Sequence, residues 1–238
     1  MRRRSVDVHR LSAEQRATLS AQLYEVYCDS VAGLDRQAFD AEVLASDDTR
    51  LALFYAANGT LAGFAYRRFD HVEHAGRRHA VICAGVYFRR GHKGGAAGGR
   101  FGLGESLRFK LRHPRTPLAY MTRSASPAVY RLLAGTMPRI YPHPHVATPP
   151  DVDATFRAVH ARRGYQPVAD SPWVVRSIAV PTQPGRLNHL RGDPLVEYYL
   201  GENPHFAQGN ALLVWIPLDL RNVVGAALRL GWRRLRGH

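Results

Sequence analysis

The sequence has little cysteine, and this scarcity excludes several classes of protein. Only Cys28 and Cys83 occur among its 238 residues. Two cysteines cannot build a disulfide framework, and they cannot complete a four-cysteine metal site. We therefore expect both to be reduced residues of the hydrophobic core, as in proteins of the cytosol, where disulfides are rare.

Lysine is nearly absent as well, although the chain is strongly basic. The formal net charge is +14, from 33 basic and 19 acidic residues, yet Lys93 and Lys110 are the only lysines. Such an excess of arginine, together with abundant alanine, glycine and proline, is typical of a GC-rich coding bias. The charge therefore permits anionic partners but does not by itself indicate nucleic acid.

Long hydrophobic runs are also missing. No segment of the sequence approaches the roughly 18 consecutive apolar residues of a membrane-spanning helix. The basic start at residues 1–4 is not followed by the apolar stretch of a signal peptide. Hydrophobic residues make up 45% of the chain and charged residues 22%, which is ordinary for a globular protein with a buried core.

The first 45 residues have the apolar spacing of helices. Ser12 is a helix cap with Gln15 three residues later, and apolar residues follow at helical spacing as far as Val31. A second, shorter helix is predicted to begin near Asp35.

Residues 50–88 instead have the pattern of strands. A first apolar run is followed by Asn58-Gly59, a strong hairpin signal, and by a second run at 61–69. A polar turn then leads to a third run at 79–88. The segment predicts an antiparallel meander of three strands, or of four if the middle strand breaks.

A glycine-rich segment follows the third strand. Residues 89–100 hold five glycines, and a helical pattern follows at 101–112. Glycines allow backbone N–H groups to approach an anion, and a helix N-terminus adds partial positive charge. The segment therefore predicts a phosphate-binding loop. The segment is not a Walker loop, because Lys93 precedes the glycine pair instead of following it. It is not a dinucleotide-binding fingerprint either, because that motif needs a parallel βαβ unit, and here an antiparallel meander precedes the glycines.

Short elements alternate with prolines in the remainder of the chain, and residues 136–150 alone hold five prolines. The pattern predicts a strand at 118–122, helices at 128–134 and 151–163, strands at 174–180 and 211–218, and a basic amphipathic helix at 222–236.

The order of these elements and two stretches of sequence resemble the GNAT superfamily of acyl-CoA acyltransferases. The first stretch, Arg90-Gly91-His92-Lys93-Gly94-Gly95, is similar to the family's Arg/Gln-x-x-Gly-x-Gly/Ala loop. The second, residues 126–133, is similar to its helix with a Leu-Tyr pair and places a tyrosine at Tyr130. The resemblance covers residues 12–180. It implies an α/β fold with a mixed, mostly antiparallel sheet flanked by helices.

The resemblance also implies roles for individual residues. A backbone N–H in the strand Val86–Phe88 would polarise a thioester carbonyl, and Tyr130 would protonate the departing thiolate. Acyl-CoA is the implied donor substrate. The residues that would hold its pyrophosphate, together with the strand end, are Val86, Phe88, Arg89, Arg90, Gly91, His92, Lys93, Gly94 and Gly95.

No carboxylate in the strand before the loop stands out as the general base that an acyl transfer to an amine requires. The candidates are Glu73, or one of His71, His74 and His79 acting through water. The histidines of the proline-rich stretch have no cysteine or carboxylate neighbours, so we predict no metal site.

We therefore expect an enzyme that moves an acyl group from acyl-CoA, or from an acyl carrier protein, to an amine-bearing small molecule or lipid-like acceptor. Apolar runs such as 211–220 suggest a bulky substrate and are loosely similar to those of long-chain N-acyl amino acid and autoinducer synthases. The alternatives are a non-catalytic CoA-binding protein and a basic protein that binds nucleic acid or a membrane surface.

The placement of the charge favours the thioester donor over nucleic acid. Residues 67–115 hold twelve basic and three acidic residues around the predicted loop. Most aromatic residues in this stretch stand at core-like positions, so the nucleobases of a bound nucleic acid would have few aromatic side chains to stack on. The 222–236 helix, with arginines beside Leu228 and Trp232, also fits a membrane surface.

We expect one GNAT-like domain over residues 1–220, with its core at 12–180 and an extension at 181–220, followed by the basic helix at 221–238. The expected location is the cytoplasm, with peripheral membrane contact through residues 222–236 left open.

Overall fold

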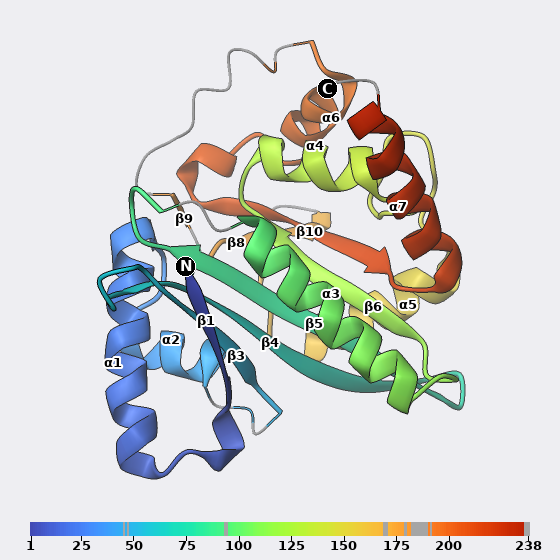
Figure 1. Ribbon diagram of the computed structural model, residues 1–238. Helices are drawn as coiled ribbons and strands as arrows, with labels where there is room; N and C mark the ends of the chain where they lie inside the picture. The colour runs from blue at the N-terminus through green and yellow to red at the C-terminus, as the bar shows by residue number, and fades with distance from the viewer. Residues whose placement is uncertain are drawn as a thin grey trace. The chain divides into compact units, whose positions relative to one another are not determined.

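The computed structural model describes residues 1–44, 46, 48–92, 95–168, 171–178, 180–181, 190 and 192–235. Its elements are shown in Figure 1. They group into two compact units. Unit 1 is Met1–Phe69, Ile82–Pro114 and Ile178–Gln183, and unit 2 is Asp70–Val81, Arg115–Ser177 and Pro184–His238. The expectation of a single domain over residues 1–220 stays a prediction.

Unit 1 contains one end of the sheet. Its strands follow in the order β1 (Arg2–Asp7), β3 (Arg50–Tyr55), β4 (Leu61–His74) and β5 (Arg77–Phe88). The end of β4 and the start of β5, within Asp70–Val81, belong to unit 2. The pairings of β1 with β3 and of β3 with β4 are antiparallel. The turn between β3 and β4 is the one the sequence predicts: Gly59 has a φ of 83°, and the Asn58 side chain accepts the N–H of Thr60 at 3.1 Å.

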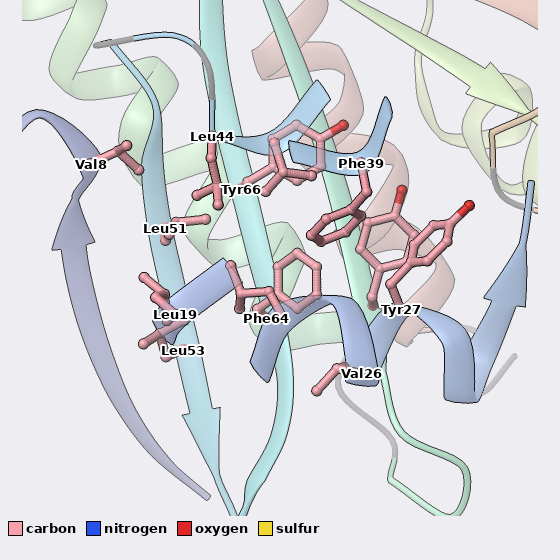
Figure 2. Close-up of a cluster of buried hydrophobic side chains, with 13 residues drawn as sticks. Val8, Leu19, Val26, Tyr27, Phe39, Leu44, Leu51, Leu53, Phe64 and Tyr66 are labelled. Atoms are coloured by element: carbon pink, nitrogen blue, oxygen red, sulfur yellow. The ribbon is translucent and has the colours of Figure 1, made fainter. Parts of the chain in front are cut away.

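Helices cover both faces of these strands because apolar side chains alternate along them. Leu51, Leu53 and Phe64 belong to a buried cluster with α1 (Ala13–Ser30) and α2 (Arg36–Val43), shown in Figure 2. The intervening residues Ala52 and Phe54 pack on the opposite face, against α3 (Gly95–Arg112). The short strands β2 (Val31–Ala32) and β9 (Val180–Pro181) pair beside α1.

Unit 2 contains the other end of the sheet. In the order of neighbouring strands, the first part of β5 is followed by β6 (Leu118–Ser124), β10 (Asn210–Pro217), β8 (Ser171–Arg176) and β7 (Pro167–Val168). The central strand β10 is antiparallel to both β6 and β8. The helices of this unit are α4 (Pro127–Thr136), α5 (Pro150–Arg162), α6 (Pro194–Glu202) and α7 (Leu220–Leu235).

The predicted fold class is confirmed: the structure is a mixed α/β fold whose sheet is mostly antiparallel. The predicted antiparallel meander is confirmed as β3, β4 and β5. The expectation that both cysteines lie in the core is wrong for Cys28, which is exposed on α1, whereas Cys83 is buried. Neither cysteine forms a disulfide.

Candidate functional site: the loop between β5 and α3

The predicted strand, loop and helix follow one another in unit 1. Strand β5 ends at Phe88, and the chain turns so that the N–H of His92 donates to the carbonyl of Arg89 at 3.1 Å. Gly91 within this turn has a φ of 81°, a conformation that favours glycine. Helix α3 then begins at Gly95. Lys93 and Gly94, the two remaining residues of the predicted loop, lie outside the described residues.

The first turn of α3 lies close to the end of β5. A Cβ on Gly98 would stand 2.7 Å from both γ-carbons of Val86, so glycine is what permits this approach. The first turn contains no acidic residue. The helix N-terminus therefore presents its partial positive charge beside the loop without a carboxylate in its own first turn.

Val86 and Phe88 lie on the face of β5 that α3 covers. Val86 is 42% exposed. Phe88 is half-buried, with its ring 5.2 Å from the ring of Phe54. A Cβ at Gly63 on the neighbouring strand would fall 2.3 Å from the Phe88 ring, so β4 needs glycine at that position. The structure thus brings the two predicted strand residues together with the loop.

Two arginines of the loop are held by carboxylates from α1. The backbone N–H of Arg90 donates to the Asp29 carboxylate at 2.7 Å, and its Nε donates to the Asp29 carbonyl at 2.8 Å. Arg89 donates to Glu25 at 3.2 Å and to the carbonyl of Leu61 at 3.0 Å. These acidic partners precede the arginines by more than sixty residues, so no local pattern in the sequence could have identified them.

Arginines of the basic stretch 67–115 are paired with carboxylates, so fewer of its positive charges are available to an anionic ligand than the sequence suggests. Arg67 donates to Glu105 at 2.9 Å and pairs with Asp48, and Arg68 pairs with Glu42. The acidic partners Glu42 and Asp48 lie outside the stretch. Part of the positive charge counted in the sequence is therefore neutralised within unit 1.

Tyr130 belongs to unit 2, where it lies on α4 and is fully buried. Its hydroxyl donates to the carbonyl of Pro142 at 2.9 Å. Burial raises the pKa of the Tyr130 phenol well above its usual value, with smaller contributions from Tyr198 and Glu202. A raised pKa means that the phenol gives up its proton less readily, and that proton is already donated to a backbone carbonyl.

The candidate bases lie around the hairpin that joins β4 to β5. Glu73 is exposed on β4, and the turn after it contains two residues of positive φ, Ala75 and Gly76. The rings of His74 and His79 are 6.2 Å apart. Burial lowers the pKa of His79, and the nearby His74 and Arg77 lower it further.

Glu73 and these histidines belong to unit 2, and the hairpin precedes β5 whereas the loop follows it. Unit 1 therefore holds the described loop residues, and unit 2 holds both predicted catalytic residues.

The described part of the chain contains no group of three or more histidine, cysteine or acidic side chains placed to hold a metal ion. Among the same residues, no helix is both long enough and apolar enough to cross a membrane.

Comparisons with known proteins give distant structural similarities. No protein-family model matches the chain, and no curated protein matches it. Among solved structures, a chain of the NatC complex bound to Gag peptide and CoA is 13% identical, with 92% of this chain and all of that chain covered and a TM-score of 0.39. A GCN5-related N-acetyltransferase from Kribbella flavida is 10% identical, with 91% and 98% covered and a TM-score of 0.37. An acyl-CoA N-acyltransferase from Pseudomonas aeruginosa is 17% identical, with 60% and 91% covered and a TM-score of 0.35.

Proposed function

We propose that the chain is a GNAT-type acyltransferase that takes its acyl group from a CoA thioester and passes it to an amine. The observation that carries this proposal is the join between β5 and α3. A strand ends in a turn that requires glycine, the turn holds two arginines, and a helix free of acidic residues in its first turn begins directly afterwards. This is an arrangement of backbone and side-chain donors that suits a pyrophosphate.

In this proposal the pyrophosphate lies at residues 89–95, with Arg89, Arg90 and Lys93 supplying charge. The Asp29 carboxylate now accepts the N–H of Arg90, so an incoming phosphate oxygen would replace one anionic acceptor by another. The pantetheine arm would extend along the exposed Val86 toward the thioester.

The chemical step forms one bond and breaks one. The neutral amine attacks the thioester carbonyl carbon, a C–N bond forms, and the C–S bond breaks. A backbone N–H in Val86–Phe88 stabilises the developing oxyanion. The amine proton passes to Glu73, or through water to His71, His74 or His79, and the thiolate takes the proton of Tyr130.

An acyl carrier protein carries the same phosphopantetheine arm and is the second donor in this proposal. The acceptor is an amine-bearing small molecule or a lipid-like amine, in the cytoplasm or at a membrane surface. A non-catalytic CoA-binding protein is the alternative, and it would bind the same thioester without turning it over.

Calorimetric titration of the full chain with acetyl-CoA and longer acyl-CoAs tests the proposal. The two lysines form a matched pair: Lys93→Ala removes a charge from the loop, whereas Lys110→Ala removes one whose ammonium donates to the Pro114 carbonyl at the end of α3. We expect Lys93→Ala, and likewise Arg90→Ala, to weaken binding about tenfold, because each removes a charge-assisted contact to phosphate.

Lys110→Ala should bind like the wild type. Absence of binding by a folded wild-type chain, for every acyl-CoA tested, would overturn the proposal in its CoA form. Binding without turnover of any amine would favour the non-catalytic alternative.

A further inference from the structure

Helix α7 has a buried face and an apolar face that is largely exposed. Asn222 is fully buried and Ala226 is 6% exposed. The opposite face carries an apolar stripe at spacings of four residues, which align along one side of a helix. We call it the α7 stripe; its members and their exposures are Leu220 79%, Val224 47%, Leu228 60% and Trp232 60%.

The buried face of α7 is fixed in place by polar contacts. The Asn222 amide donates to the carbonyls of Arg139 at 2.8 Å and Pro217 at 2.7 Å, and its oxygen accepts the N–H of Arg139 at 2.8 Å. A Cβ at Gly225 would stand 2.5 Å from Pro138, so the helix is also packed closely there. Rotating the α7 stripe inward would break these three side-chain hydrogen bonds of Asn222, which therefore favour the outward position of the stripe.

The charge of α7 has one sign. Residues 220–235, the span of α7, contain no aspartate or glutamate, and they contain four arginines: Arg221, Arg229, Arg233 and Arg234. An outward apolar stripe within a cationic helix matches a surface that is anionic outside and apolar beneath.

We propose that α7 docks the protein on an anionic lipid bilayer, with the α7 stripe inserted at the headgroup level and the arginines on lipid phosphates. This inference does not depend on acyl transfer. A second copy of this chain is a poorer occupant, because two α7 helices would bring arginines against arginines with no carboxylate of either helix to pair them. Nucleic acid would satisfy the arginines but would leave the α7 stripe in water.

Trp232 provides a direct readout. The other two tryptophans are less accessible: Trp215 is 4% exposed, and the partly buried Trp173 stacks on Phe156 with ring centroids 3.8 Å apart. A blue shift of tryptophan fluorescence on adding vesicles therefore reports mainly on Trp232 entering an apolar environment.

The experiment mixes the full chain, without CoA, with vesicles of phosphatidylcholine alone or with about 30% phosphatidylglycerol. We expect a blue shift and co-sedimentation with the anionic vesicles and little of either with the neutral ones. Binding should weaken in about 0.5 M salt, because salt screens the arginine–phosphate attraction.

Two exposed leucines of unit 2 form a matched pair of variants. Leu228→Ser removes a member of the α7 stripe and should lower partitioning onto anionic vesicles about tenfold. Leu132→Ser removes a leucine of α4 that is 61% exposed and should leave partitioning unchanged. The double variant Arg221→Gln/Arg229→Gln removes two of the four arginines of α7 and should reduce the preference for anionic lipid. Arg229 also donates to the Met137 carbonyl at 3.0 Å, so folding of this variant is checked as well.

Three results would overturn the proposal. They are a lack of vesicle binding by the folded wild type, equal binding to neutral and anionic vesicles, and dimerisation in lipid-free solution that Leu228→Ser abolishes. Circular dichroism of each variant confirms that a loss of binding does not reflect a loss of folding.

Discussion

At the residue scale, Glu105 joins α3 to two strands of unit 1 through a single carboxylate. One of its oxygens accepts from Arg50 on β3 at 3.1 Å, and the other accepts two donors of Arg67 on β4, each at 2.9 Å. The side chains of Glu105 and Arg67 are 11% and 10% exposed, so water screens the attraction between their charges only weakly.

Glu105→Gln should therefore destabilise the protein by about 2 kcal/mol, because Arg50 and Arg67 lose their shared anion while each keeps another carboxylate, Asp7 for Arg50 and Asp48 for Arg67. Chemical denaturation measures the change. The control is Glu25→Gln, which breaks the pair with Arg89 but affects a carboxylate that is 69% exposed. The cost there should stay below about 1 kcal/mol. Equal costs for the two variants would contradict the role assigned to Glu105.

Tyr130 and Tyr199 provide a second matched comparison. Both are fully buried, and each hydroxyl donates to a backbone carbonyl at 2.9 Å, Tyr130 to Pro142 and Tyr199 to Ser124. Tyr130→Phe should cost about 1 kcal/mol of stability, because a buried hydrogen bond is lost. Tyr199→Phe should cost at least as much, because the Tyr199 hydroxyl also accepts from the Asn203 amide at 3.2 Å. If Tyr130 is the acid for the leaving thiolate, Tyr130→Phe should also lower kcat roughly a hundredfold, whereas Tyr199→Phe should leave kcat unchanged.

Turnover and denaturation measured on the same preparations separate the two effects. If Tyr130→Phe lowers the stability but leaves kcat unchanged, Tyr130 is a packing residue of α4 and not the acid.

At the element scale, helix α3 begins earlier than the sequence predicts. The helical pattern indicates a start at residue 101, whereas the helix begins at Gly95 and includes four further glycines. Each glycine inside a helix costs about 1 kcal/mol relative to alanine, so a sequence pattern assigns such a run to a loop. Part of what offsets this cost is packing: Phe101 of α3 is 5% exposed and joins a cluster with Phe54 on the sheet.

Gly98 and Gly99 should respond in opposite ways to substitution by alanine. Nothing lies within 4 Å of a Cβ added at Gly99, so Gly99→Ala should stabilise the protein by up to about 1 kcal/mol through helix propensity. At Gly98 the same methyl group would collide with Val86, whose branched side chain has little freedom to move. Gly98→Ala should therefore be less stable than Gly99→Ala by more than about 1 kcal/mol. Thermal unfolding of the two variants checks this ranking, and an equal gain for both would show that α3 does not approach β5 closely.

Strand β1 was not predicted, because its sequence carries almost no strand signal. Residues Arg2–Arg4 are exposed, and Val6 packs against the core cluster of α1 and α2. The strand exists because its backbone pairs with β3, from Arg2 opposite Tyr55 to Asp7 opposite Arg50. Helix α6 is absent from the prediction for a different reason. Its cap, Asp193 followed by Pro194, is a recognisable helix start, but the prediction rests on apolar spacing and does not use this cap.

At the scale of the whole molecule, the sequence predicts local features and misses long-range partners. The meander is predictable because alternating apolar residues and an Asn-Gly turn lie within one stretch of chain. The loop is predictable because glycines and arginines are adjacent. The pairing of Arg90 with Asp29, or of Arg67 with Glu105, depends on how strands and helices meet in space. The spacing of apolar residues along the sequence does not predict such a pairing.

Several histidines of unit 2 couple the stability of the molecule to pH. Burial lowers the pKa of His79, His143 and His160 from the ordinary 6.5, and neighbouring positive groups lower each one further. The His160 ring packs near Phe156 and Tyr165, and its Nε2 is buried without a hydrogen-bond partner among the described residues. These three side chains accept a proton more readily in the unfolded chain than in the folded one.

The free energy of unfolding should therefore fall as the pH decreases below about 6.5, because the unfolded state then binds more protons than the folded state. Above about pH 7.5 these histidines are neutral in both states and contribute no slope. Urea denaturation at a series of pH values from 8 to 5 measures the curve, and His160→Gln should flatten it by removing one of the three groups. A wild-type stability that stays constant or rises on acidification to pH 5 would show that these rings are not held neutral by the fold.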